Sequence, residues 1–155
     1  MILFNRILLP TDFSNNAASA RDYACELADK FGAQLHVLSV VQDVALVLPE
    51  TGMFLTVLLP SVPEIVETAE TALKSVLDPE WASRHDVVRQ VLVGTPDLKI
   101  VQYSIEEQMD LIVMGTHGRT GLQHVMLGSV AERVLRKSKC PVLTIRSAAL
   151  PGDSY

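Results

Sequence analysis

Four small residues in the C-terminal third of the chain have a spacing suited to binding an anion. Gly115 and Gly118 have two residues between them, and Gly128 and Ser129 follow after nine more. Glycines allow positive φ and a close approach of the backbone to a ligand. A helix that begins at Ser129 would add unpaired N–H groups and the positive end of its dipole. The spacing therefore favours a phosphate-binding loop that ends at a helix N-terminus.

Each of these residues also has an ordinary structural explanation. Ser129 and Glu132 have the S-x-x-E spacing of a capping box, so Ser129 is expected at a helix start even without a ligand. Gly128 alone fits the beginning of any helix, and Gly115 alone fits the end of any strand. The combined spacing favours phosphate binding, because a helix cap does not require it.

A second polar segment, Pro10-Thr11-Asp12-Phe13-Ser14, follows an apolar run near the N-terminus. The glycine-bearing segment follows another apolar run, which ends at Met114. Open parallel sheets bind ligands beyond the carboxyl ends of their strands, where the strand order reverses. We therefore expect both segments on one rim of a sheet.

The elements that position these segments are visible in the apolar pattern. Continuous apolar runs, typical of strands buried on both faces, predict strands over 2–9, 35–41, 86–93, 111–114 and 142–145. Each connection is long enough for a right-handed crossover. The alternation predicts an α/β fold: an open, mostly parallel five-stranded sheet with helices on both faces.

Capping and stop residues predict four helices between these strands. In the third of them, Leu98, Val101 and Ile105 have helical spacing and are expected to face the core. The helices are expected from the N-cap Ser14 to Gly32, from Ser61 and Pro63 to Asp78-Pro79, from Thr95-Pro96 to about Gln108, and over 129–137.

Residues 44–62 have a different composition, with 12 apolar residues among 19. Pro49, Glu50, Gly52 and Pro60 divide them into pieces far shorter than the roughly 20 apolar residues of a membrane span. We expect a long loop over the core, with a mobile lid or a partner-binding surface as the alternative.

The composition favours one well-packed domain in a reducing compartment. The 155 residues are 48% hydrophobic and include two cysteines, Cys25 and Cys140, without the spacing of a disulfide scaffold or a metal site. The N-terminus lacks the charged and apolar regions of a signal peptide, so a cytoplasmic location is expected. The four histidines show no zinc-type spacing.

The net charge of −5 conceals two regions of opposite sign. Residues 111–146 hold six basic residues and one acidic residue, a net charge of +5, and the rest of the chain carries −10. The sum argues against nucleic acid as a partner, whereas the local field suits one small polyanion.

On these residues the chain resembles the universal stress protein family, in its ATP-binding class. The resemblance extends from the segment ILLPTDFS (7–14) through LIVMGTHGRTGL (111–122) and MLGSVAERVLRKS (126–138) to CPVLTIR (140–146). The ATP-binding members carry the pattern G-2x-G-9x-G-[ST], which this chain matches without a gap. The resemblance implies one domain over 1–147 with a Rossmann-like fold, similar to that of the adenine-nucleotide α-hydrolases, and a tail over 148–155.

The resemblance also implies ATP with Mg²⁺ as the ligand. Asp12 would lie beside the adenosine, Val40 would pair its backbone with the adenine edge, and the glycine segment would hold the phosphates and ribose. His117 and Arg119 either add charge to that loop or point to solvent. The expected binding residues are Pro10, Thr11, Asp12, Val40, Met114, Gly115, His117, Gly118, Arg119, Gly128, Ser129 and Val130.

For the function, the resemblance implies a regulator in the stress response and a homodimer formed through Pro141 to Arg146. No catalytic residue is assigned, because no nucleophile or positioned base is evident in the sequence. Two alternatives remain open: an enzyme that slowly hydrolyses ATP or transfers its adenylate, and a dimeric scaffold without a ligand. The protein partner and the stress are not specified.

Overall fold

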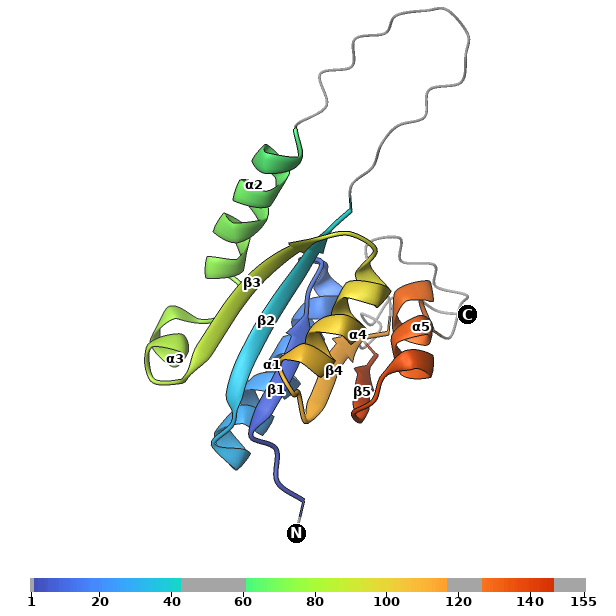
Figure 1. The fold of residues 1–155 in the computed structure, drawn as a ribbon. Helices are drawn as coiled ribbons and strands as arrows, with labels where there is room; N and C mark the ends of the chain where they lie inside the picture. Colours follow the sequence, from blue (N-terminus) through green and yellow to red (C-terminus); the bar gives the residue numbers. More distant parts are fainter. Residues whose placement is uncertain (1, 43–60, 117–126, 147–155) are drawn as a thin grey trace, which may run out of the picture.

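The computed structural model describes residues 2–42, 61–116 and 127–146. In this part of the chain five strands form one sheet in the order β3-β2-β1-β4-β5, and every neighbouring pair is parallel (Figure 1). The predicted open α/β sheet is confirmed. The strands are β1 (Arg6–Pro10), β2 (Gln34–Val41), β3 (Val87–Val93), β4 (Leu111–Gly115) and β5 (Val142–Ile145).

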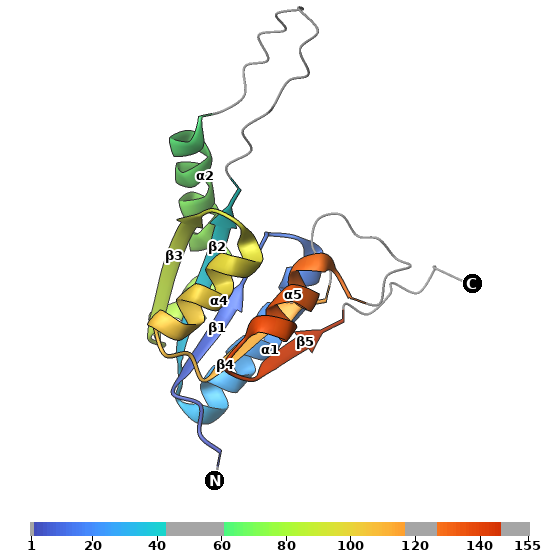
Figure 2. The same ribbon diagram turned by 45° about the vertical axis from the view of Figure 1, so that its right-hand side comes forward.

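Helices cover both faces of this sheet. One face is covered by α1 (Asn15–Phe31), α2 (Val62–Lys74) and the short α3 (Pro79–Ser83), and the other by α4 (Pro96–Glu106) and α5 (Ser129–Lys137). Figure 2 shows α4 and α5 side by side on their face.

The strands build two cores because side chains alternate along a strand. Ile7 and Leu9 of β1 pack toward α1, whereas Leu8 between them packs toward α4 and α5. All three side chains are fully buried. The central strands therefore lie between two apolar layers, as their continuous apolar runs predict.

Helix α1 begins and ends as its sequence predicts. The Ser14 hydroxyl accepts the Ala17 N–H at 3.3 Å, and Gly32 adopts φ 64° at the C-cap. The buried residues of the helix are all alanines, so the helix can approach the sheet closely. These alanines are Ala17, Ala20, Ala24 and Ala28.

The structure corrects the expected face of α4. Leu98 and Ile105 are 51% and 52% exposed, while Ile100 and Tyr103 are buried. A polar contact explains why this side of α4 is buried. The Tyr103 hydroxyl forms a hydrogen bond with His36 Nδ1 of β2 at 2.8 Å, which fixes the rotation of the helix on the sheet.

Two boundaries and one short helix also differ from the sequence-based expectation. The first strand begins at Arg6, and Ile2 is 75% exposed. Helix α2 ends at Lys74, before the expected stop. Asp78 instead caps α3, a helix that was not predicted, by accepting the Trp81 N–H at 2.8 Å.

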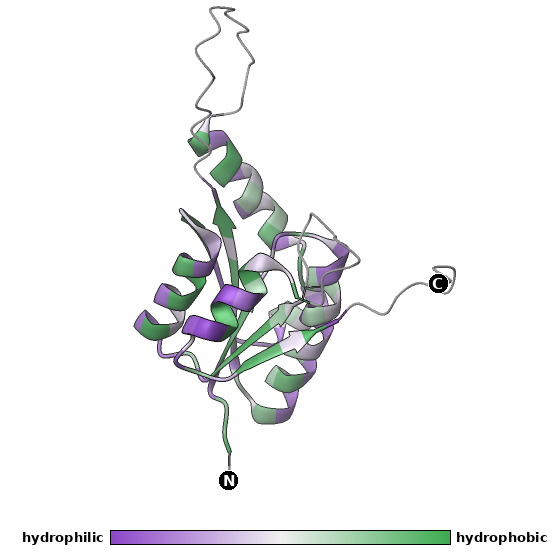
Figure 3. Ribbon diagram, turned by 90° about the vertical axis from the view of Figure 1, so that its right-hand side faces the viewer, coloured by the Kyte–Doolittle hydropathy of each residue, from purple (hydrophilic) through white to green (hydrophobic). Residues whose placement is uncertain are grey.

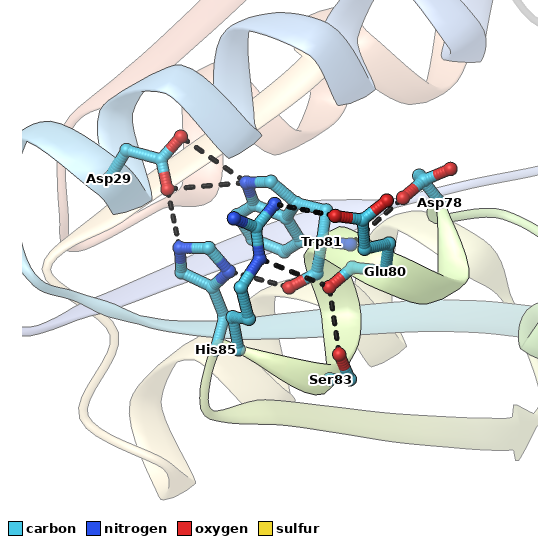
Figure 4. A network of polar contacts seen from close by, with 7 residues as sticks. Asp29, Asp78, Glu80, Trp81, Ser83 and His85 are labelled. Carbon is cyan, nitrogen blue, oxygen red and sulfur yellow. Dashed lines mark hydrogen bonds and ion pairs between the residues drawn. The ribbon is translucent and has the colours of Figure 1, made fainter.

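Helix α3 is held against the C-terminal end of α1 by a polar and aromatic cluster (Figure 4). The Asp29 carboxylate accepts the indole N–H of Trp81 at 3.2 Å and pairs with His85 Nε2. The rings of Trp81 and His85 stack with their centroids 3.8 Å apart, and His85 Nδ1 lies 2.6 Å from the Trp81 carbonyl oxygen. This cluster fixes the connection that leads into β3.

The apolar segment 44–60 and the tail 148–155 lie outside the described residues, so the predictions made for them stay predictions. None of the helices in the described part is both long enough and apolar enough to cross a membrane.

Candidate functional site

The two polar segments singled out in the sequence are brought to one rim by the pairing of β1 with β4. Ile7 pairs with Leu111, and Leu8 with Ile112. From β1 the chain continues to β2 on one side, whereas β4 pairs on the other side, so the strand order reverses here. Such a switch point is the usual ligand-binding position in an open parallel sheet. The described parts of the two segments, Pro10 to Ser14 and Gly115-Thr116, therefore follow neighbouring strands at one rim, as expected.

A tight hydrogen-bonded turn follows β1. The Thr11 N–H donates to the Leu38 carbonyl of β2 at 2.8 Å, and the Ser14 N–H donates to Asp12 Oδ1 at 3.0 Å. Phe13 adopts φ 66°, a left-handed conformation uncommon for a large side chain, while its own N–H donates to Thr11 Oγ1 at 3.1 Å. The turn sets the N-terminus of α1 at the rim.

Gly115 ends β4 against the first turn of α1. A Cβ atom at this position would lie 2.9 Å from the Asn16 carbonyl oxygen. Among the described glycines, Gly32 and Gly94 have a positive φ, and Gly115 does not. The expectation of positive φ at Gly115 is therefore wrong, because the glycine is needed to let α1 approach.

Gly128 and Thr116 join the two ends of the glycine-bearing loop. The Gly128 N–H donates to the Thr116 carbonyl at 2.6 Å, and the Thr116 N–H donates to the Ile145 carbonyl of β5 at 2.9 Å. Thr116 is buried. It was not among the predicted site residues, since nothing in the sequence distinguishes this threonine from any other residue after a strand.

The N-cap of α5 is Gly128, and Ser129 is the first helical residue. The Glu132 N–H donates to the Gly128 carbonyl at 2.9 Å, which is the first bond of the helix. The capping-box interpretation of Ser129 is therefore wrong. An N-cap without a side chain supplies no capping oxygen to the N–H groups of the first turn, and these groups lie at the positive end of the helix dipole.

The other described candidates have side chains that are buried in the core or packed against it. Met114 and Pro10 are buried, and the Met114 side chain lies in the core between the sheet and α4 and α5. Val40 and Val130 are partly buried and pack against the same core. The remaining three predicted residues, His117, Gly118 and Arg119, lie outside the described residues.

A buried carboxylate fixes α5 beside α4. Asp97 is 2% exposed and accepts a hydrogen bond from Lys137 Nζ at 2.7 Å, and Arg133 Nη1 lies 3.7 Å from its other oxygen. The hydrogen bond from Lys137 lowers the pKa of Asp97 despite its burial. An aspartate in a first helical turn is expected for the helix dipole alone, so the sequence contained no sign of this pairing.

The Cys25 thiol and the metal-ligating side chains of the described residues form no second candidate site. Burial raises the pKa of the Cys25 thiol to about 11, which keeps it protonated and a poor nucleophile. Within 2–42, 61–116 and 127–146, no three His, Cys, Asp or Glu side chains are grouped as a metal site requires. A groove of about 470 Å³ lies between α4 and the strands β2 and β3, away from the rim.

An open parallel sheet with the N-termini of α1 and α5 at its switch point defines a Rossmann-like α/β protein. The sequence comparison narrows this class. The model of the universal stress protein family matches residues 3–146. Universal stress protein MJ0531 of Methanocaldococcus jannaschii is 36% identical over 148 residues, which are 93% of this chain and 83% of that protein. The chain belongs to the universal stress protein family.

Solved structures show the same fold. The structure of MJ0577 from the same archaeon has a TM-score of 0.79 and 28% identity, covering 96% of this chain and 100% of that one. A universal stress protein in complex with cAMP has a TM-score of 0.69 and 21% identity, covering 95% and 100%. The Archaeoglobus fulgidus protein in complex with dAMP has a TM-score of 0.60 and 24% identity, covering 94% and 99%. Because their sequence identity is below 25%, the cAMP and dAMP complexes show only that the fold is similar.

Proposed function

We propose that this protein binds ATP at the rim formed by β1 and β4 and acts as a nucleotide-dependent regulator in the stress response. The observation that carries the proposal is the start of α5. Its N-cap, Gly128, has no side chain, and it lies at the topological switch point within hydrogen-bonding distance of the residue that follows β4. An anion placed there gains hydrogen bonds and charge stabilisation together.

The proposed roles rest on the positions of the described residues and, for residues 117–119, on the glycine spacing of the sequence. The N–H groups of Ser129 and Val130 hold phosphate, with Gly118, His117 and Arg119 from the same loop. Asp12 accepts a hydrogen bond from a ribose hydroxyl or from the adenine amine. The Val40 backbone meets the adenine edge, and Pro10, Thr11, Met114 and Gly115 form the floor between them.

Mg²⁺ fits such a site as a companion of the nucleotide. Asp12 supplies a carboxylate at the described rim, and its Oδ1 already accepts the Ser14 N–H. Mg²⁺ commonly keeps several waters and binds through substrate phosphates and one or two carboxylates. The ion would neutralise phosphate charge, while the chain's own part is to orient the nucleotide.

The fold-level comparison supports an adenine nucleotide as the ligand class. Two proteins of this fold have been solved with cAMP and dAMP, which share the adenine and phosphate groups that the rim would recognise. The basic character of residues 111–146 supports a polyanion.

The experiment that tests the proposal begins with the nucleotide released when the purified protein is denatured, followed by calorimetric titration with ATP and Mg²⁺. Gly128→Asp, whose carboxylate would accept the N–H groups proposed for phosphate and repel the anion, should keep the fold, because φ −69° and ψ 156° at Gly128 suit any residue and aspartate is a favourable N-cap. We expect its affinity for ATP to fall at least about tenfold, or about 1.4 kcal/mol. Thr95→Val, at the N-cap of α4, is the matched control and should leave the affinity unchanged.

The same preparations separate the other functions. No released nucleotide and no heat of binding would contradict the proposal and favour a scaffold without a ligand. Steady ATP turnover near 1 s⁻¹ or faster, a rate typical of enzymes, would favour an ATPase or an adenylate-transferring enzyme. We propose turnover far below that rate.

The proposal includes the setting in which the protein works. We propose one domain over 1–147 with a short tail, a cytoplasmic location, a protein partner that is still to be identified, and a homodimer formed through Pro141 to Arg146. Strand β5 is an edge of the described sheet, and Leu143 on it is 37% exposed. An apolar edge strand is commonly covered by a second chain.

A further inference from the structure

Helix α4 has two apolar stripes, and only one of them is covered by the described part of the chain. Ile100 and Tyr103 face the core between α4, α5 and the sheet. Leu98 and Ile105, with the partly buried Val101 between them, form a second stripe at helical spacing. A helix that is apolar on opposite sides is normally buried on both. Among residues 2–42, 61–116 and 127–146, the outer stripe therefore has no partner that covers it.

The outer stripe lies on the side of α4 that faces α5. Asp97, which contacts Lys137 and Arg133 of α5, marks that side of the helix. Successive residues of a helix are about 100° apart around its axis, so Leu98, Val101 and Ile105 all lie within about 100° of Asp97, on its solvent-facing side. The stripe and the outer surface of α5 thus form one continuous face.

The α5 half of this face is basic. Arg133, Arg136 and Lys137 have side chains 59%, 75% and 43% exposed, and Lys139 follows the helix. Glu132 is the single acidic residue of α5. In Figure 3, α5 faces the viewer and its outward side is largely purple, beside the alternating green and purple of α4. These four cations outnumber the two carboxylates that pair with them, because Glu132 pairs with Arg136, and Asp97 with Lys137 and Arg133. An apolar stripe therefore borders a face of net positive charge.

We propose that the α4–α5 face, made of Leu98, Val101, Ile105, Arg133 and Arg136, docks an acidic amphipathic helix of another protein. Apolar side chains of that helix at i, i+3 or i+4, and i+7 would cover the outer stripe of α4, as in other helix-in-groove complexes. Its carboxylates would pair with the arginines of α5. The acidic flank sets the orientation and the rate of encounter, and the apolar stripe supplies most of the affinity. This docking does not depend on nucleotide binding.

The test uses a fluorescein-labelled helical peptide of about 16 residues with leucines at i, i+3, i+7 and i+10 and glutamates on the flanks. A sister peptide has lysines in place of the glutamates. Titration with the purified protein is followed by fluorescence anisotropy. We expect the acidic peptide to bind at least about tenfold more tightly than the basic one, with the difference shrinking as salt is raised.

Protein variants locate the binding surface. Leu98→Asn with Ile105→Asn, and separately Arg136→Glu, should each weaken the acidic peptide about tenfold, since a few anchors carry most of the energy in such interfaces. Tyr23→Asn is the matched control: Tyr23 is 52% exposed on α1, on the opposite face of the sheet. It should bind like the wild type.

Amide chemical shifts of the wild-type protein locate the peptide-binding surface independently, without any variant. The acidic peptide should shift amides of α4 and α5 and leave those of α1 unchanged. No binding of the acidic peptide, equal affinity for both peptides, or shifts confined to other elements would overturn the proposal. A change of sedimentation coefficient in the double variant without peptide would also overturn it, by assigning the face to a second copy of the chain.

Discussion

At the scale of single residues, Gly115 shows how one missing side chain positions a helix. Substitution with alanine places a Cβ 2.9 Å from the backbone oxygen of Asn16, a contact that only a shift of α1 relieves. We expect Gly115→Ala to cost about 1–3 kcal/mol of unfolding free energy and to weaken ATP binding, because the β1–α1 turn moves with the helix. Chemical denaturation and calorimetry measure the two effects.

Gly32 provides the matched comparison for this prediction. It adopts φ 64° at the other end of α1, and a Cβ added there would meet open space, with nothing packed within 4 Å of it. Gly32→Ala should therefore destabilise through backbone strain alone, by about 1–2 kcal/mol, and leave ATP affinity unchanged. Equal losses of affinity in both variants would show that Gly115 acts only on global stability.

His36 predicts a pH dependence of stability. The imidazole is 4% exposed, and its burial lowers its pKa below the ordinary value of 6.5. Tyr103 and Gln34 contact its two nitrogens at 2.8 and 2.7 Å. The unfolded chain takes up a proton near pH 6.5, whereas the folded chain resists it, so this stabilisation is complete above pH 6.5 and is lost as the pH falls.

Thermal unfolding between pH 7.5 and 5.5 checks this prediction. The contribution of His36 to the free energy of unfolding is at most about 1.4 kcal/mol for each unit by which its pKa differs between the folded and the unfolded chain. His36→Gln keeps a polar side chain that does not titrate in this range, so its stability should fall less steeply than that of the wild type. Parallel curves for the two proteins would contradict the assignment.

At the scale of elements, the contact of Asp97 with Lys137 fixes α5 relative to α4. Asp97→Asn removes the charge from a buried hydrogen bond to a cation, so we expect a loss of about 1.5–3 kcal/mol of unfolding free energy. Because the pKa of Asp97 is lowered, this contribution persists at neutral pH and disappears only in acid. Denaturant unfolding at pH 7 measures it.

A double-mutant cycle with Lys137→Met isolates the pair. We expect the combined loss to be smaller than the sum of the single losses, since either substitution breaks the same bond. Glu132→Gln is the control: it removes an exposed ion pair with Arg136 and should change stability by less than about 1 kcal/mol. Strict additivity of the Asp97 and Lys137 losses would mean that the contact does not hold the helices together.

At the scale of the whole molecule, the exposed edge at β5 predicts the oligomeric state. Leu143 lies on this edge strand and is 37% exposed. A charge placed there cannot be buried against a second chain without a large desolvation cost. We expect Leu143→Asp to be monomeric and folded, whereas the wild type sediments as a dimer.

Leu135 supplies the control for the dimer prediction. It is 42% exposed on α5, a helix that packs on one face of the sheet and not along its edge. Leu135→Asp should keep the dimer if strand pairing is the main contact. A wild-type protein that sediments as a monomer at micromolar concentration would contradict the proposed homodimer.

Short-range patterns along the chain were enough to predict the five strands, apart from the start of β1, and the α/β class. Continuous apolar runs such as residues 35–41 define buried parallel strands, and local caps such as Ser14 and Gly32 define helix ends. Both are properties of neighbouring residues, so they can be read before the chain folds. The glycine spacing indicated the same rim that the pairing of β1 with β4 brings together.

Packing between the helices and the sheet determines which side of each helix is buried. It also determines the structural role of each glycine. Sequence periodicity placed Leu98 and Ile105 inward, but Tyr103 and Asp97 turn α4 the other way, through bonds to His36 and Lys137. Likewise Gly115 is required by α1, and Gly128 rather than Ser129 caps α5. These contacts join residues far apart in the chain, and their geometry depends on how the layers pack, which no local pattern contains.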